Sequence, residues 1–192
     1  MLASYKVRMF NRKASSRTSC PEQIVETLAL QPGQTIADIG AGGGYFSLRF
    51  AKLVGSQGHV YSLDTNRDSL EFIDNSADEK GLRNVTTILV REDNELPLPK
   101  NSIDLIFMRN LCHHLPNRME HFRKLREVLK TEGEVAVIEY RSNSGGRFSF
   151  HRLFGHYVPQ EIIIREMFEA GFKLQEEFDF LPEQSFTIFR MK

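Results

Sequence analysis

The stretch Ile36–Ala51, "IADIGAGGGYFSLRFA", decides how the rest of the chain is interpreted. A short apolar run is followed by four glycines within five residues, Gly40 and Gly42 to Gly44, and then by apolar residues at helical spacing. This order predicts a buried strand, a tight loop and a helix. Glycine allows the loop backbone to adopt left-handed conformations and to come close to a ligand.

The segments on either side continue the alternation of strand and helix. Strands are expected over 34–39, 58–64, 84–90, 102–108 and 133–140, and helices over 21–30, 45–54, 67–80, 117–130 and 159–170. Such alternation predicts a parallel sheet with helices on both faces. Two segments of alternating polarity, 172–180 and 184–191, predict a C-terminal antiparallel hairpin. The expected fold is therefore α/β, with a seven-stranded, mostly parallel sheet.

The bulk composition indicates one globular domain. The chain has 192 residues, of which 41% are hydrophobic and 26% charged, and its formal net charge is zero. A neutral chain lacks the global charge that attracts nucleic acid. It also lacks a run of about 18 apolar residues that could span a membrane. Two distant cysteines, Cys20 and Cys112, suggest reduced thiols and a cytoplasmic protein.

The domain plan follows from the charge and glycine content. Residues 1–20 are basic and are expected to form an arm or lid, with an organellar transit peptide as the alternative. Residues 21–192 form the single domain. Within it, the glycine- and aromatic-rich segment 141–158 is expected to be a loop or insertion on the acceptor side.

Three ligand types compete for the glycine loop. A Walker-type phosphate loop requires a following Lys-Ser/Thr, which is missing here. A dinucleotide loop requires a third small residue where Tyr45 stands, and Asp38 would repel a pyrophosphate. The remaining pattern, D-x-G-x-G-x-G, suits a ligand with a cationic end near Asp38 or the strand-end carbonyls. The start of the next helix favours a carboxylate. S-adenosylmethionine has both groups and no phosphate.

The motif "ADIGAGGGYFSLRFA" resembles motif I of class I S-adenosylmethionine-dependent methyltransferases. Asp64, at the end of the second strand, and "LVREDNELPLPKNSIDLIFMRNLCHHL" (89–115) resemble that family's later motifs. The resemblance covers about residues 18–192 and is closest to the small-molecule branch, which includes ubiquinone/menaquinone-biosynthesis and arsenite-methyltransferase-like proteins. It implies a Rossmann-like methyltransferase fold with strand order 3-2-1-4-5-7-6.

The same resemblance implies a cofactor site. Asp64 is expected to bind the ribose hydroxyls, one of Glu92 and Asp93 the adenine amino group, and the backbone of Asn110 and Leu111 the methionine part. The full implied set is Asp38, Gly40, Ala41, Gly42, Gly44, Asp64, Thr65, Glu92, Asp93, Asn110 and Leu111.

Candidate catalytic residues follow the fourth and fifth strands. His113 or His114 could act as a general base, and Tyr140 could position or deprotonate an acceptor. The alternatives are that the histidines pack or cap the next helix and that Tyr140 is an aromatic wall. No third ligand lies near enough in sequence to complete a metal site, so no metal is expected. Asp104, inside a strand, is interpreted as structural.

The predicted function is methyl transfer to a small-molecule acceptor by in-line displacement, with S-adenosylhomocysteine as the product and a monomer or homodimer as the working form. Four arginines (Arg8, Arg12, Arg17 and Arg141) could bind an anionic acceptor, with solvated surface charge as the alternative. Three other functions stay open: an RNA or protein methyltransferase, a non-catalytic S-adenosylmethionine-binding subunit, and a nucleotide-binding oxidoreductase.

Overall fold

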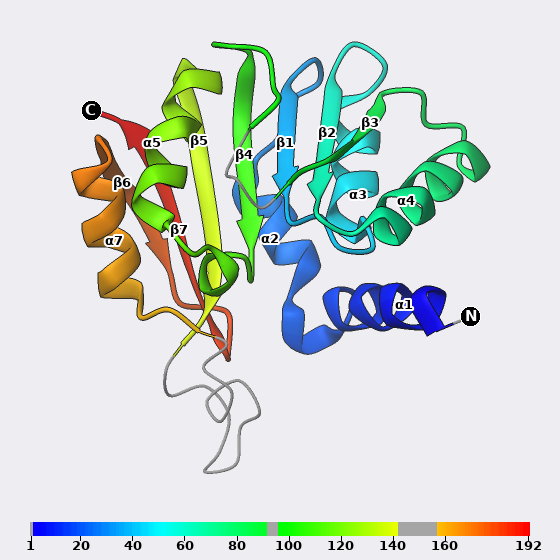
Figure 1. Cartoon of the computed structure of the whole chain (residues 1–192), viewed down its shortest axis with the longest axis horizontal. Helices are drawn as coiled ribbons and strands as arrows, with labels where there is room; N and C mark the ends of the chain where they lie inside the picture. Colours follow the sequence, from blue (N-terminus) through cyan, green and yellow to red (C-terminus); the bar gives the residue numbers. More distant parts are fainter. Residues whose placement is uncertain (1, 92–95, 142–156) are drawn as a thin grey trace.

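The computed structural model describes residues 2–91, 96–141 and 157–192, and shows a central sheet between two layers of helices (Figure 1). The strands are β1 (Thr35–Ile39), β2 (His59–Asp64), β3 (Val85–Leu89), β4 (Ile103–Arg109), β5 (Leu129–Tyr140), β6 (Phe172–Phe178) and β7 (Gln184–Met191). The helices are α1 (Leu2–Ala14), α2 (Pro21–Leu28), α3 (Tyr45–Val54), α4 (Arg67–Glu79), α5 (Arg118–Val128) and α7 (Gln160–Glu169), with 3-10 turns η1 (Arg17–Ser19) and η2 (Cys112–His114).

The strand order is β3-β2-β1-β4-β5-β7-β6, which confirms the order implied by the resemblance. The first five strands pair in parallel, and β7 pairs antiparallel with both β5 and β6; the β6–β7 pair is the hairpin that the alternating C-terminal segments predicted. Because β1 and β4 are neighbours, the loops that follow them lie at the same edge of the sheet. That edge is where open parallel sheets bind their ligands.

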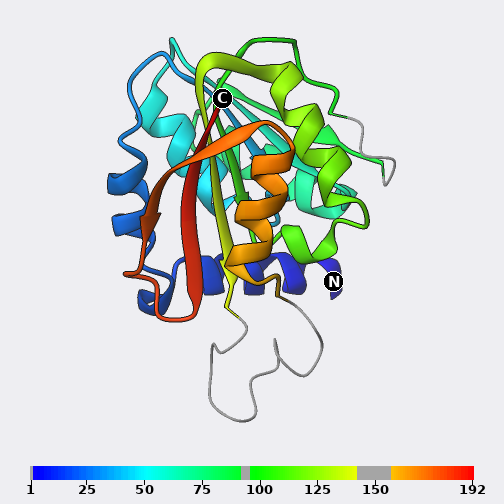
Figure 2. The same cartoon turned by 90° about the vertical axis from the view of Figure 1, so that its left-hand side faces the viewer.

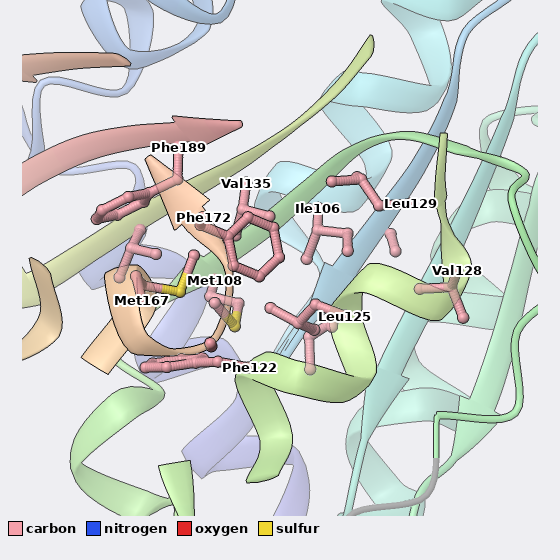
Figure 3. Close-up of a cluster of buried hydrophobic side chains, with 14 of the residues drawn as sticks. Ile106, Met108, Phe122, Leu125, Val128, Leu129, Val135, Met167, Phe172 and Phe189 are labelled. Carbon is pink, nitrogen blue, oxygen red and sulfur yellow. The ribbon is translucent and has the colours of Figure 1, made fainter. Parts of the chain in front are cut away.

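Alternation along the strands divides the core into two clusters. On one face, Phe122 and Leu125 of α5 and Met167 of α7 pack with sheet residues such as Met108 and Val135 (Figure 3). On the other face, residues of α2 and α3, including Phe46 and Phe50, pack against alternate strand residues such as Ile36, Leu105, Phe107 and Ile138. Side chains of a strand point to its two faces in turn, so one short apolar strand supplies both clusters.

Helix α1 lies below α3 and α4 in the view of Figure 1, and it runs across the carboxyl ends of the parallel strands, at the bottom of Figure 2. It packs against α4 and α3, and its Val7 is only 2% exposed. The side chain of Asn11 donates from Nδ2 to the carbonyl of Gly43 at 2.8 Å. The basic N-terminal segment is thus attached directly to the glycine loop.

The junction between α5 and β5 differs from the expectation. The helix ends at Val128 rather than Lys130, and the strand begins at Leu129 rather than Gly133. Leu129 pairs with Ile103, a register shift follows, and Lys130 binds the carboxylate of Asp104 at 2.8 Å. Glycine suits position 133 inside this strand because there is no room for a side chain: a Cβ there would lie 2.9 Å from the carbonyl oxygen of Ile103. Tertiary pairing therefore overrides the helical pattern of 129–130.

Asp104 has a structural role, as interpreted from the sequence. Its Oδ2 accepts from the backbone N–H of Thr35 at 2.8 Å, and both carboxylate oxygens bind Lys130. These contacts join the starts of β1, β4 and β5. They lie at the opposite edge of the sheet from the glycine loop.

His121 of α5 predicts a pH-dependent stability. It is 4% exposed, neither ring nitrogen has a hydrogen-bond partner among the described residues, and burial lowers its pKa to about 4. The unfolded chain takes up this proton near pH 6.5, so stability falls as the pH drops from 6.5 towards 4, by of order 3 kcal/mol. His121→Leu should remove this part of the slope in urea unfolding measured at pH 4.5 and 7. An identical slope in variant and wild type would contradict the assignment.

Candidate functional site

The glycine loop after β1 is a tight turn built from left-handed residues. Gly40, Gly42 and Gly44 have φ of 76°, 55° and 73°. The N–H groups of Gly40 and Ala41 both donate to the carbonyl of Leu63 at the end of β2, at 2.8 and 3.0 Å. A Cβ on Gly42 would meet no described atom within 4 Å, so bare backbone borders open space there. A side chain at these positions would strain the loop.

Asp64 fixes the loop from the neighbouring strand. Its Oδ2 accepts from the Gly42 N–H at 2.8 Å, and its Oδ1 accepts from the Asn66 N–H at the same distance. Burial raises the pKa of this carboxyl, while the two backbone donors oppose the shift. The predicted ribose-binding residue is thus held against the predicted cofactor loop. Thr65, next to it, is exposed.

Asp38 lies beneath the loop rather than on its surface. It is 3% exposed and accepts a hydrogen bond from the Ser47 hydroxyl of α3 at 2.5 Å. Burial raises its pKa to about 7, and the bond from Ser47 limits that rise. A nearby cation would lower the pKa of Asp38, because a cation stabilises the charged form of the carboxyl. Its influence on a ligand would be electrostatic, through the loop.

The end of β4 approaches the glycine loop from the other side. A Cβ on Gly40 would lie 3.1 Å from Cδ1 of Leu111, so this glycine makes room for the β4 loop. Asn110 is left-handed, with φ 54°, and its N–H donates to the carbonyl of Ile138 at 2.8 Å. The structure therefore brings Gly40, Asp64, Asn110 and Leu111 to one edge. Glu92 and Asp93 lie outside the described residues.

His113 is held by a buried carboxylate that the sequence interpretation missed. Its Nδ1 lies 2.9 Å from Oε1 of Glu139, and the two side chains are 5% and 0% exposed. Glu139 also accepts from the backbone N–H of His113 at 3.3 Å and of Tyr140 at 2.8 Å. This pair fixes the ring orientation and joins the ends of β4 and β5.

The three candidate catalytic side chains are not gathered at one point. The rings of His113 and His114 lie against each other, with centroids 4.0 Å apart and planes tilted by 46°, on the side of Glu139. Tyr140 follows Glu139 in the strand, so it points to the opposite face. There it is 4% exposed, and Nζ of Lys13 lies 5.0 Å from its ring centroid. Burial raises the pKa of the neighbouring Cys112 thiol, which disfavours a reactive thiolate.

Two charged residues that the sequence interpretation missed stand at the ends of apolar runs. Glu139 ends "VAVIE", and Arg109 ends "LIFMR", where a strand's burial pattern calls for apolar side chains. A charge in such a run costs free energy to bury unless it is paired. A charged residue at a position expected to be buried was therefore the signal in the sequence that could have identified both residues. Among the described residues no group of three or more His, Cys, Asp or Glu could hold a metal ion, and no helix is long and apolar enough to cross a membrane.

Comparisons with curated proteins give distant relatives with related names. The ubiquinone/menaquinone biosynthesis C-methyltransferase of Vibrio parahaemolyticus is 27% identical over 136 residues, which are 67% of this chain and 52% of that protein. The demethylmenaquinone methyltransferase of Listeria welshimeri is 25% identical over 166 residues, 85% of this chain and 67% of the relative. The chain therefore spans about half the length of the Vibrio relative.

Solved structures share the fold at lower identity. A SAM dependent methyltransferase from Aquifex aeolicus has a TM-score of 0.85 and 22% identity, with 97% of both chains covered. The [4+2]-cyclase SpnF has a TM-score of 0.74 and 17% identity, covering 91% of this chain and 80% of that one. A family model described as "Methyltransferase domain" matches residues 30–178. The chain therefore belongs to the methyltransferase domain family, as its glycine loop predicted.

Proposed function

We propose that this protein transfers a methyl group from S-adenosylmethionine to a small-molecule acceptor and releases S-adenosylhomocysteine. The observation that carries the proposal is the glycine loop held against Asp64 through the Gly42 N–H. Bare backbone beside a fixed carboxylate suits a ribose and an amino-acid end, and no lysine follows the loop to bind a phosphate. Membership of the methyltransferase domain family supports the same conclusion.

The residues present fit this cofactor. Asp64 would accept from the ribose hydroxyls, Asp38 would favour the cationic end through the loop, and the backbone of Asn110 and Leu111 would border the methionine part. When bound, the cofactor supplies a methyl group already activated on a sulfonium. The chain's contribution is then to align the acceptor, which can lower a barrier by several kcal/mol, up to about 7–11 in ideal cases.

His113 is our candidate for the general base. Glu139 holds its Nδ1, so Nε2 is the nitrogen that would take a proton from an acceptor hydroxyl or carbon acid. His114, which lies against its ring and is exposed, would shape the same surface. Tyr140 would contribute from the other face as a positioning group.

The acceptor is proposed to be a small hydroxylated ring. The names of the curated relatives refer to quinone biosynthesis, so a reduced naphthoquinone is the first compound to test. Residues 1–20 are proposed to act as a lid, because Asn11 of α1 bonds the glycine loop. Action in the cytoplasm, as a monomer or homodimer, is part of the same proposal.

Competing functions have distinct signatures. SpnF shows that the fold also occurs in a protein named as a cyclase, so transfer of a labelled methyl group to the reduced naphthoquinone is the direct test. Tight S-adenosylhomocysteine binding without transfer to any small acceptor would favour a non-catalytic subunit. Thermal stabilisation by NAD alone would favour an oxidoreductase, and salt-dependent RNA binding would favour an RNA methyltransferase.

Asp64→Ala should weaken S-adenosylhomocysteine binding ten- to a hundredfold, measured by calorimetry. The loss of charge-assisted hydrogen bonds costs roughly 1.5–3 kcal/mol, and the loop also loses its bond from Gly42. The matched control is Asp68→Ala. Asp68 is an exposed aspartate in the first turn of α4, so its loss should leave the affinity unchanged. Equal affinity of Asp64→Ala and wild type, with the fold intact, would remove Asp64 from the site.

Binding should release a proton from Asp38. Its pKa is raised to about 7 by burial, so at pH 6.5 most molecules carry the proton, and a ligand ammonium nearby favours its loss. Calorimetry of S-adenosylhomocysteine at pH 6.5 in phosphate and in imidazole should therefore show a buffer-dependent enthalpy. Asp38→Asn, which still accepts from Ser47, should reduce that dependence. The same dependence in both proteins would assign the proton to another group.

His113→Gln should slow methyl transfer to an acceptor that must lose a proton by about 10²–10⁴-fold. Glutamine can still donate to Glu139, so the buried carboxylate keeps a partner and the fold should survive. S-adenosylhomocysteine affinity should stay within twofold of wild type. His114→Gln, with a rate near wild type, is the control. A normal rate for His113→Gln with the same acceptor would exclude His113 as the base.

A further inference from the structure

Arg109 is a partly buried cation at the carboxyl end of β4. Its guanidinium lies over the ring of Phe46, with Cζ 5.2 Å from the centroid, and Nη2 donates to Oε1 of Gln184 at 3.1 Å. The Nε–H is buried and has no hydrogen-bond partner among the described residues. The residue as a whole stays partly accessible, so a ligand can approach it.

Within the described ranges, no carboxylate forms an ion pair with Arg109. Burial lowers the pKa of Arg109, and Asp38 acts on it favourably from a distance. Asp38 compensates the charge poorly, because it is bonded to Ser47 and its own pKa is raised to about 7. Buried charges in proteins are normally paired, so this guanidinium has capacity for an anion.

The guanidinium is held in a fixed orientation. Gln184 is 4% exposed, and its Nε2 donates to Oδ1 of Asn110 at 2.5 Å, which turns its Oε1 towards Arg109. Gln184 sits on β7 opposite Tyr140 of β5. Phe46 covers one face of the guanidinium, and the Nε–H of Arg109 meets no acceptor among the described residues. A rigid, oriented guanidinium binds planar oxyanions well.

The surroundings are aromatic and cationic. Tyr45 packs edge-on against Phe46 at 5.2 Å, and both Tyr45 and Tyr140 interact electrostatically with Arg109. Lys13 of α1 brings a second cation over the ring of Tyr140. Rings beside two cations suit a flat ligand that carries negative charge. Asn110 also belongs to the loop proposed to border the methyl donor, so such a ligand would lie next to it.

We propose that Arg109, positioned by Gln184, binds a carboxylate carried by the hydroxylated aromatic acceptor, so that this enzyme prefers an aromatic acid to an uncharged reduced quinone. The inference rests on the proposed function, because the ligand is an acceptor only if the protein transfers a methyl group. Binding of a carboxylate at Arg109 can be tested without that function. The other source of a carboxylate is the methionine end of the cofactor. The start of α3, beyond the glycine loop, already offers a favourable place for that group.

The test is a titration of the whole 192-residue chain with benzoate and with benzamide, each with and without saturating S-adenosylhomocysteine. NMR follows the arginine Nε–Hε signal that is missing in Arg109→Lys. Benzoate should shift this signal and benzamide should not, because only benzoate carries the charge. Absence of a benzoate shift in wild type would overturn the proposal, and this reading does not depend on how any variant folds.

Variants then locate the charge. Arg109→Gln should weaken benzoate binding at least tenfold and leave S-adenosylhomocysteine affinity within twofold of wild type. The matched control is Arg49→Gln. Arg49 of α3 also lies over an aromatic ring, that of Tyr45, but it is paired with Glu22 at 2.9 Å, so this variant should bind benzoate normally.

The remaining outcomes separate the two proposals. Loss of S-adenosylhomocysteine affinity in Arg109→Gln, with benzoate binding unchanged, would assign Arg109 to the cofactor's carboxylate and overturn the acceptor site. If wild type binds benzoate through Arg109 but does not bind S-adenosylhomocysteine, the anion site stands and the proposed methyl-donor function fails.

Discussion

The edge of the sheet is organised by three backbone N–H groups that turn towards β2. Those of Gly40 and Ala41 bind the carbonyl of Leu63, and that of Gly42 binds the carboxylate of Asp64. In this loop Gly40, Gly42 and Gly44 have left-handed backbone, which other residues adopt only with strain. Once they form, the loop is closed on one side by β2 and on the other by Leu111 of the β4 loop.

The charged groups behind this edge are arranged in separate environments. Asp38 accepts a hydrogen bond from Ser47, and Glu139 accepts three, two from His113 and one from the next backbone N–H. Among the described residues, the hydrogen-bond partner of Arg109 is the neutral amide of Gln184. The two carboxylates are therefore satisfied within the protein, whereas the guanidinium is satisfied in part. A low-dielectric edge with one unbalanced charge favours a ligand of the opposite sign.

The sequence was most informative where local chemistry and tertiary structure agree. The spacing around Gly40–Gly44 predicted the strand, loop and helix, and α3 has the expected bounds of Tyr45–Val54. It was least informative where long-range pairing decides, as at Leu129, which is recruited into β5 by Ile103. The roles of Glu139 and Arg109 were not predicted, because their partners, His113 and Gln184, are 26 and 75 residues away in sequence. No local pattern identifies such a pair.

The burial of Asp38 and of His121 has a joint effect on the whole protein. Asp38 binds its proton more tightly in the folded chain, so its contribution to stability declines as the pH rises from 3.8 through 7, whereas that of His121 increases between 4 and 6.5. The two slopes offset each other, so the free protein should tolerate mild acid evenly. A cation bound near Asp38 stabilises the carboxylate and so cancels the pH dependence of stability that comes from Asp38. The pH dependence from His121 stays, so the ligand-bound protein loses more stability in acid than the free protein does.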